Sequence, residues 1–153
     1  MTAAGSPISL GPGEGDHFSV GADQVTLLGS TGQRGDGFSV VDYRGAVGQA
    51  GPPMHVHHTF EECWIILEGE VQFRVRGDVM VGRPGSFLLV PRETPHTFQV
   101  LSPARWLGIF SPARYVGLIE DLGQLLAGGG PPAEDAVLSL FQRYLSSGLF
   151  QAD

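Results

Sequence analysis

The chain has 153 residues, of which 42% are hydrophobic, so it is long enough for one domain with a substantial core and too short for two. Its formal net charge is −7, and all nine basic residues are arginines, which leaves no basic patch for phosphate groups and excludes nucleic acid as an expected partner. The apolar runs are only strand-sized, so we expect no membrane-spanning segment.

Composition also indicates the fold class and the compartment. The 23 glycines and 11 prolines are spread along the chain rather than gathered in one tract. This distribution is typical of turns between many short strands, and it favours an all-β domain. Cys63 is the single cysteine, and no charged N-terminal start is followed by an apolar run, so we expect a cytoplasmic protein without disulfides.

Short β-prone runs separated by turn residues predict the body of the fold. Residues 1–16, rich in Gly, Ser and Pro, are expected to form a flexible N-terminal arm, and residues 17–110 a β-domain. The expected strands are 18–20, 24–28, 38–43, 62–68, 71–75, 79–81, 87–90, 97–101 and 105–110. The runs on either side of Gly69 predict a hairpin, and Gly77-Asp78 predicts a second tight turn. So many short strands predict a sandwich or a small barrel.

From Ser111 onward, the apolar residues recur with the period of an α-helix. Ser111 is suited to be the N-cap and Pro112 the first helical residue, and the pattern continues to a run of glycines. A second helix is expected from the next pair of prolines to Gly148. We therefore expect residues 111–153 to form a helical segment packed on the β-domain.

Four of the five histidines fall in two short segments, which carry the strongest chemical signal in the chain. One segment contains His55, His57 and His58, and the other contains His96. Residues two apart in a strand share a face, so His55 and His57 can direct their imidazoles at one point. Glu62 has the opposite parity, so the chain must turn or bulge before its carboxylate can join them. Three nitrogens and one carboxylate oxygen predict a site for one divalent transition-metal ion, with open positions for substrate or water.

The alternative explanation places these histidines in surface loops, because a bare His-x-His pair is weak evidence. The surrounding residues favour the metal site, since the sequence resembles the cupin family over both of that family's signature segments. Residues matching the first cupin motif are Gly51, His55, His57, Glu62 and Gly69, and those matching the second are Gly85, Pro91 and His96. The resemblance covers residues from about 17 to 110 and implies a double-stranded β-helix, or jelly-roll barrel, with the metal ion inside.

The resemblance also decides between neighbouring ligand candidates. In the first motif six residues separate the glutamate from the glycine, which selects Glu62 over Glu61 as the carboxylate ligand. Glu61 is then a solvated neighbour, and His58 an outer residue that gates the site or donates a hydrogen bond. The expected metal ligands are His55, His57, Glu62 and His96. The ion can be iron, manganese, nickel, cobalt, copper or zinc, because mixed nitrogen and oxygen ligation accepts all of them.

The sequence departs from the second motif at two positions. Glu93 stands where the motif usually has glycine, and Val100 where it usually has asparagine. The first glycine of the first motif also lies closer to His55 than in the original pattern. None of these is a ligand position, so the departures concern the geometry of the loops rather than the coordination of the ion.

A finer resemblance, to single-domain cupins of the quercetin 2,3-dioxygenase type, implies an activity. It rests on Gly-Pro-Pro-Met-His-Val-His-His at 51–58, Ile-Leu-Glu-Gly-Glu at 66–70, Thr-Pro-His at 94–96 and Ile-Phe-Ser-Pro at 109–112. The likeness implies a metal-dependent dioxygenase that uses dioxygen on an enolisable or phenolic small molecule, flavonol-like or polyketide-like. Glu62 would then be both a metal ligand and the base that accepts the substrate's proton.

Two other functions remain open from the sequence. One is a non-redox metal enzyme, an isomerase, cyclase or lyase, in which the ion acts only as a Lewis acid. The other is a cupin that binds a small molecule without converting it. These functions share the fold and the metal ligands, and they differ only in the pocket.

Four aromatic residues are candidates for an apolar substrate pocket, namely Trp64, Phe73, Phe98 and Phe110. Trp64 and Phe98 lead this set, because each lies two residues beyond a predicted ligand and so points in the same direction. The alternative is that all four belong to the core.

We also expect a homodimer. The resemblance to cupins, which commonly pair, implies such a partner. The N-terminal arm could add a strand to an open sheet edge of a neighbouring copy.

Overall fold

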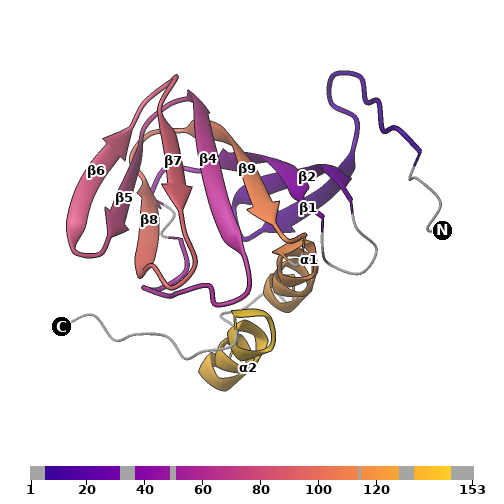
Figure 1. Cartoon of the computed structure of the whole chain (residues 1–153). Helices are drawn as coiled ribbons and strands as arrows, with labels where there is room; N and C mark the ends of the chain where they lie inside the picture. The colour runs from indigo at the N-terminus through magenta and orange to yellow at the C-terminus, as the bar shows by residue number, and fades with distance from the viewer. Residues whose placement is uncertain (1–5, 32–36, 49–50, 114, 128–132, 146–153) are drawn as a thin grey trace.

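A computed structural model describes residues 6–31, 37–48, 51–113, 115–127 and 133–145. Within these ranges the β-strands precede two C-terminal helices, as the sequence predicts (Figure 1). The strands are β1 (Asp16–Val20), β2 (Asp23–Ser30), β3 (Ser39–Gly45), β4 (Glu61–Glu68), β5 (Val71–Val75), β6 (Asp78–Gly82), β7 (Phe87–Val90), β8 (His96–Val100) and β9 (Ala104–Ser111). The helices are α1 (Tyr115–Leu126) and α2 (Glu134–Leu145).

The strands form two antiparallel sheets with the core between them. The larger sheet has the order β1-β2-β3-β9-β4-β7, and the smaller has the order β6-β5-β8. Strands of the larger sheet alternate between buried and outward-facing residues, most clearly in β9. Inward side chains from both sheets therefore fill one interior, which is the jelly-roll architecture implied by the cupin resemblance.

The predicted hairpin about Gly69 is wrong. Strand β4 pairs with β7 and β9 in the larger sheet, whereas β5 pairs with β6 and β8 in the smaller one. Gly69 marks the corner at which the chain crosses between the sheets, with a positive φ of 73° and no room for a Cβ beside the carbonyl of Pro103. The second predicted turn is confirmed: Arg76 and Gly77 both have positive φ and join β5 to β6.

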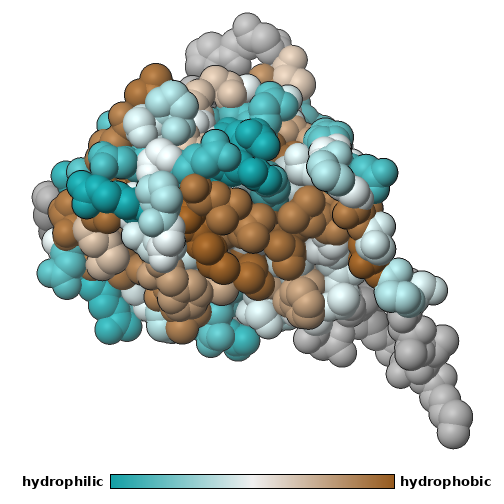
Figure 2. All heavy atoms as spheres, turned by 90° about the horizontal axis from the view of Figure 1, so that it is seen from above, coloured by the Kyte–Doolittle hydropathy of each residue, from teal (hydrophilic) through white to brown (hydrophobic). Residues whose placement is uncertain are grey.

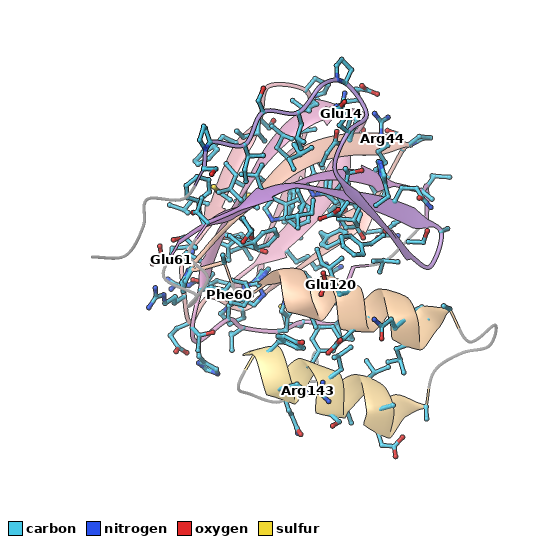
Figure 3. All side chains as sticks on the ribbon, turned by 90° about the vertical axis from the view of Figure 1, so that its right-hand side faces the viewer. Glu14, Arg44, Phe60, Glu61, Glu120 and Arg143 are labelled. Atoms are coloured by element: carbon cyan, nitrogen blue, oxygen red, sulfur yellow. The ribbon has the colours of Figure 1, made fainter. Side chains whose placement is uncertain are left out.

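The helices lie beneath the barrel, and Figures 1 and 3 show them side by side there. Helix α1 begins at Tyr115 rather than at Pro112, because Ser111 still pairs with Glu61 as the last residue of β9. Gly123 of α1 packs directly on the carbonyl of Ser19, where a Cβ would come within 2.9 Å of that oxygen. The second predicted helix is confirmed as α2, and its predicted end at Gly148 lies outside the described residues.

Stacked aromatic rings form the centre of the barrel. The indole of Trp106 lies between Tyr43 and Trp64, with ring centroids 4.3 and 4.9 Å apart and nearly parallel planes. Phe73 and Phe98 meet the ring of Trp64 edge-on. We call these five residues the aromatic core. Such contacts add to the free energy of burying the rings, by roughly 0.5–1.5 kcal/mol for each pair.

None of the described helices is long and apolar enough to span a membrane. Several apolar side chains are nevertheless exposed on the surface. Figure 2, which views the molecule from above, shows hydrophobic side chains gathered in the middle of that face and bordered by hydrophilic ones. Two of the most exposed are Phe87 (64%) and Leu89 (53%) on β7, the edge strand of the larger sheet.

Candidate metal centre

The two histidine segments lie side by side at one end of the barrel. The main chains of His55 and His96 exchange two hydrogen bonds of 3.1 and 3.0 Å, which places the first segment next to the start of β8. This is an isolated bridge, so His55 and His57 do not lie in a regular strand as predicted. Upstream, the amide of Gly51 donates to the carbonyl of Phe98, which extends the contact between the two segments.

Strand β4 supplies the carboxylate at the same end of the barrel. Glu62 pairs in register with Val90 of β7 and Phe110 of β9, so it sits in the middle of three strands and faces inward. The chain bends between His57 and β4, as the parity of Glu62 requires. Side chains that the fold buries at this point are His55 (5% exposed), His57 (2%), Glu62 (4%) and His96 (4%).

The side chains of these four residues converge. The three histidines each offer a ring nitrogen, and these nitrogens all lie within 4.8 Å of one another. Nε2 of His55 is 3.0 Å from Nε2 of His57, and Nε2 of His96 is 2.8 Å from Oε1 of Glu62. Ligand atoms bonded to one ion at roughly 2.1 Å and at right angles would be roughly 3 Å apart. The spacing therefore fits a shared transition-metal ion.

Main-chain carbonyls determine which ring nitrogen carries the hydrogen in two of the imidazoles. Nδ1 of His55 lies 2.8 Å from the carbonyl oxygen of Pro53, and Nδ1 of His96 lies 2.7 Å from that of Thr94. A carbonyl can only accept, so each Nδ1 carries its hydrogen and donates it. The lone pair of each neutral ring is then on Nε2, the atom that faces the cluster.

Three buried nitrogens have no hydrogen bond among the described residues: the indole nitrogen of Trp64, in the aromatic core, and two that belong to the cluster. The two in the cluster are Nδ1 of His57 and Nε2 of His96. Nε2 of His96 lies 2.8 Å from Oε1 of Glu62, but in the neutral ring this nitrogen carries the lone pair and cannot donate to a carboxylate. A buried polar atom without a partner costs free energy, and Nε2 of His96 faces the cluster, so a shared ion would satisfy its lone pair. The residues present therefore fit a metal ion.

Burial controls the charge of the first two histidines. It lowers the pKa of His55 to about 4 and that of His57 to about 3, and the nearby carboxylate of Glu62 offsets this only in part. Both rings are neutral at pH 7, so their lone pairs are available to a cation without loss of a proton.

For the other two residues, the neighbouring side chains outweigh the effect of burial on the pKa. Burial alone would lower the pKa of His96, but the adjacent negative charge of Glu62 raises it above the usual value. Burial alone would also raise the pKa of Glu62, yet the three histidines lower it. Glu62 is thus ionised at neutral pH, and its charge favours a proton on His96, with which an incoming cation would compete.

The neighbouring candidates lie outside the cluster. Glu61 is exposed on the opposite face of β4, with its carboxylate 3.9 Å from Nε of Arg92. His58 is half-buried and contacts the carboxylate of Glu93 at 2.6 Å. Glu93 has a φ of 60°, which explains why glycine is usual there, and its amide donates to the carbonyl of His57. Glu93 thereby links the loop between β7 and β8 to the histidine segment.

The four residues expected to line a substrate pocket separate into different places. Trp64 and Phe73 lie in the aromatic core, and Phe110 is buried beside Phe60, with ring centroids 6.2 Å apart. Phe98 belongs to the aromatic core and also lines a cavity under the helices. Among the described residues it is the only one of the four on that cavity.

Sequence reasoning missed two aromatic residues at the cluster. Phe60 is fully buried and stacks on the ring of His57 with centroids 4.0 Å apart, and Figure 3 labels it at this end of the barrel. Phe141 of α2 approaches His55, with ring centroids 6.3 Å apart. Phe60 directly precedes the glutamate pair, which was an available signal. No local signal assigns Phe141, because it reaches the site only through the docking of α2.

Comparisons with known proteins agree with this geometry. The sequence profile of the cupin domain family matches residues 43–110, which include all four clustered side chains. Quercetin 2,3-dioxygenase of Bacillus subtilis is 29% identical over 96 residues, or 63% of this chain. The chain spans only 28% of the length of that relative.

Solved structures resemble the fold. An RmlC-like cupin from Shewanella frigidimarina has a TM-score of 0.63 at 22% identity, covering 74% of this chain and 96% of the other. A nucleoside dehydratase of Streptomyces has a TM-score of 0.58 at 13% identity, covering 71% of this chain and 84% of the other. At these identities the likeness concerns the fold.

Proposed function

Because this chain is a cupin, we propose that it is a metal-dependent dioxygenase that acts on an enolisable or phenolic small molecule. The proposed ligands of one divalent transition-metal ion are His55, His57, Glu62 and His96. The relative in Bacillus subtilis, a quercetin 2,3-dioxygenase, supports this reaction over others that cupins host. The substrate would be flavonol-like or polyketide-like.

One observation carries the proposal. Four buried side chains that carry ligand atoms, from three separate segments of the chain, meet at one end of the barrel, and Nε2 of His96, which faces Glu62, lacks a hydrogen bond among the described residues. Surface histidines would be exposed and satisfied by water. Without an ion, a buried cluster of three histidines and a carboxylate leaves such a nitrogen unsatisfied, at a cost in free energy. The arrangement is better explained by a bound cation.

Glu62 is the residue that can move a proton. Its carboxylate is ionised at neutral pH and can accept the hydrogen of a substrate hydroxyl at Oε1 or Oε2. The lowered pKa of Glu62 makes it a weak base, so the hydroxyl must itself be made more acidic. A bound divalent cation would supply that acidity and, if it is redox-active, would also promote reaction with dioxygen.

The aromatic surroundings exclude water from the cluster. Phe60 covers one face of the His57 ring, and Phe141 lies beside His55. With little water, the electrostatic interaction between Glu62 and a bound substrate would be screened less. Side reactions of a deprotonated substrate with water would also be suppressed.

Elemental analysis followed by an oxygen-uptake screen tests the proposal. Protein purified without chelator should hold about one transition-metal ion per chain and consume oxygen with at least one member of a panel of phenols and enolisable diketones. Conversion of a panel member without oxygen uptake would instead favour the isomerase, cyclase or lyase. Binding without any product would favour the non-catalytic cupin. Absence of metal would contradict all three.

The proposal includes a homodimer. Phe87 and Leu89 point outward from β7, and they continue as two apolar rows across β4 and β9. The rows are Phe87, Ile65 and Leu107, and Leu89, Cys63 and Ile109. Phe87 and Leu89 are exposed and the other four residues are partly buried, and apolar rows of this kind are typical of an interface.

Light scattering tests the homodimer. The mass should be twice the 16.3 kDa of one chain, and the double substitution Phe87→Glu and Leu89→Glu should halve it. Val79→Glu, a change at an exposed residue of the smaller sheet, is the matched control. A wild-type mass near that of one chain over a broad concentration range would contradict the dimer.

A further inference from the structure

A cavity of about 290 Å³ lies between the helix pair and the barrel. Its walls are mostly apolar: Ile119 and Leu122 come from α1, Val137 and Phe141 from α2, and Phe98 from β8. An apolar cavity of about 150 Å³ in another protein is large enough to bind benzene. A cavity of this size therefore has room for two fused rings.

One end of the cavity is polar and carries a negative charge. Asp23 and Tyr43 line it there, and Asp23 is only 4% exposed. The hydroxyl of Tyr43 donates to Oδ2 of Asp23 at 2.7 Å, and the amide of Ala46 donates to Oδ1 at 2.8 Å. A carboxylate has about four acceptor positions, so Asp23 can accept further hydrogen bonds.

The polar side chains of the cavity favour a ligand that donates a hydrogen bond. The hydroxyl hydrogen of Tyr43 is already given to Asp23, and Pro52 and Pro53 have no amide hydrogen. The amide of Gly51 donates to Phe98. Among the described residues that line the cavity, none is an arginine or a histidine. An anion would therefore meet a buried negative charge with no cation to compensate it.

We propose that this cavity binds an uncharged aromatic molecule of one or two rings that donates a hydrogen bond from a hydroxyl group to Asp23. The rings fill the space between the two helices and Phe98, and the hydroxyl reaches the carboxylate. Carboxylated or phosphorylated molecules of the same size are rejected by the charge of Asp23.

The position of the cavity connects it to the metal cluster. Phe141 borders both, since it lines the cavity and approaches the ring of His55. Pro53 also borders both, because its carbonyl accepts the hydrogen of His55 and its ring lies on the cavity. If the proposed function holds, this ligand is the substrate, and that identification rests on the proposed function. The binding itself needs no metal.

Three probes on the wild-type, metal-free full chain test the inference. They are 2-naphthol, 2-methoxynaphthalene and 2-naphthoate, which share two rings and differ in donor and charge. Titration followed by the fluorescence of the buried tryptophans should give saturable binding of 2-naphthol. The methoxy compound should bind about 3- to 10-fold more weakly, because it lacks the donor. The carboxylate should bind more weakly still. No saturable binding of 2-naphthol, or tighter binding of 2-naphthoate, overturns the inference.

Substitutions locate the binding. Val137→Trp should fill the cavity and weaken 2-naphthol by more than tenfold, and Leu126→Trp, at the end of α1, serves the same purpose if the first variant does not fold. Gln142→Trp, on the exposed face of α2, is the matched control and should bind within about twofold of wild type. Unchanged binding in a folded cavity variant overturns the inference.

Measuring the metal content distinguishes a failure of the proposed cavity binding from a failure of the proposed function. Val137→Trp should keep the metal of the wild type while losing 2-naphthol. Metal-free wild type should keep 2-naphthol while lacking metal. Loss of both properties in a single folded variant of the cavity would contradict the separation of the two sites.

Discussion

The barrel interior has two layers built from the same strands, and they differ in what completes them. Strand β4 places Glu62 in the metal cluster and Trp64 in the aromatic core, and β8 does the same with His96 and Phe98. The aromatic core is held together by ring contacts, although the indole N–H of Trp64 has no hydrogen bond among the described residues. The metal cluster leaves two buried nitrogens without hydrogen bonds among the described residues. On β4 and on β8, residues two positions apart therefore lie in different layers, one made of packed rings and the other of side chains that can bind a metal ion.

The comparison predicts that removing a histidine empties the cluster without unfolding the barrel. His96→Ala should leave no measurable metal, because loss of a partner that merely orients a ligand already costs about 10- to 100-fold in affinity. Elemental analysis of the purified variant measures this, and circular dichroism reports the fold. Wild-type metal content in this variant would refute the ligand assignment.

Glu62→Gln separates the chemistry of the cluster from its packing. Glutamine keeps the size of the side chain and one oxygen but cannot accept a proton, so turnover should fall about 100- to 10,000-fold. Metal should be weakened by less. Glu61→Gln is the control, since Glu61 is exposed on the other face of β4, and it should be nearly neutral in an activity assay. An inactive Glu61→Gln with an active Glu62→Gln would reverse the assignment.

The substitution Trp106→Ala tests the aromatic core. The ring is 1% exposed and stacks on two neighbours, so its removal should lower the free energy of unfolding by about 3–5 kcal/mol. Trp64→Phe should cost clearly less, because it also removes an indole N–H that lacks a hydrogen bond among the described residues. Urea denaturation measures both. Folded Trp106→Ala protein should still bind metal. Loss of metal binding in this variant would show that the metal cluster depends on the packing of the aromatic core.

Acid should weaken the metal-free protein through the cluster. Below pH 6.5 the unfolded chain protonates His55 and His57, whereas the folded chain keeps them neutral until their lowered pKa values of about 4 and about 3. The unfolded state therefore binds more protons, and the free energy of unfolding should fall by about 3 kcal/mol between pH 6.5 and pH 5. The raised pKa of His96 acts above this window, and the lowered pKa of Glu62 acts below it.

Denaturation at several pH values, with and without chelator, measures this slope. His55→Gln should remove roughly half of it, because one of the two neutral rings is gone. A metal-free protein whose stability is flat from pH 6.5 to pH 5 would contradict the assigned protonation.

The sequence allowed the strands, both helices and the inward parity of Trp64 and Phe98 to be predicted, because these follow from local pattern. It also predicted which residues would converge, once the spacing from Glu62 to Gly69 was compared with the cupin motif. The crossover at Gly69 was missed because a hairpin and a corner use the same turn residues, and only distant pairing distinguishes them. Phe141 was missed for the same reason, since its position depends on how α2 docks.

The place of β9 in the larger sheet bears on how the protein is made. This strand lies between β3 and β4, with Phe110 opposite both Ser39 and Glu62. During synthesis the two halves of the sheet cannot join until residues 104–111 have left the ribosome, and such distant pairings fold slowly. His55 and His57 therefore precede the strand that joins the two halves of the sheet by about a third of the chain. The four side chains of the metal cluster can take up their final arrangement only after β9 has entered the sheet beside β4.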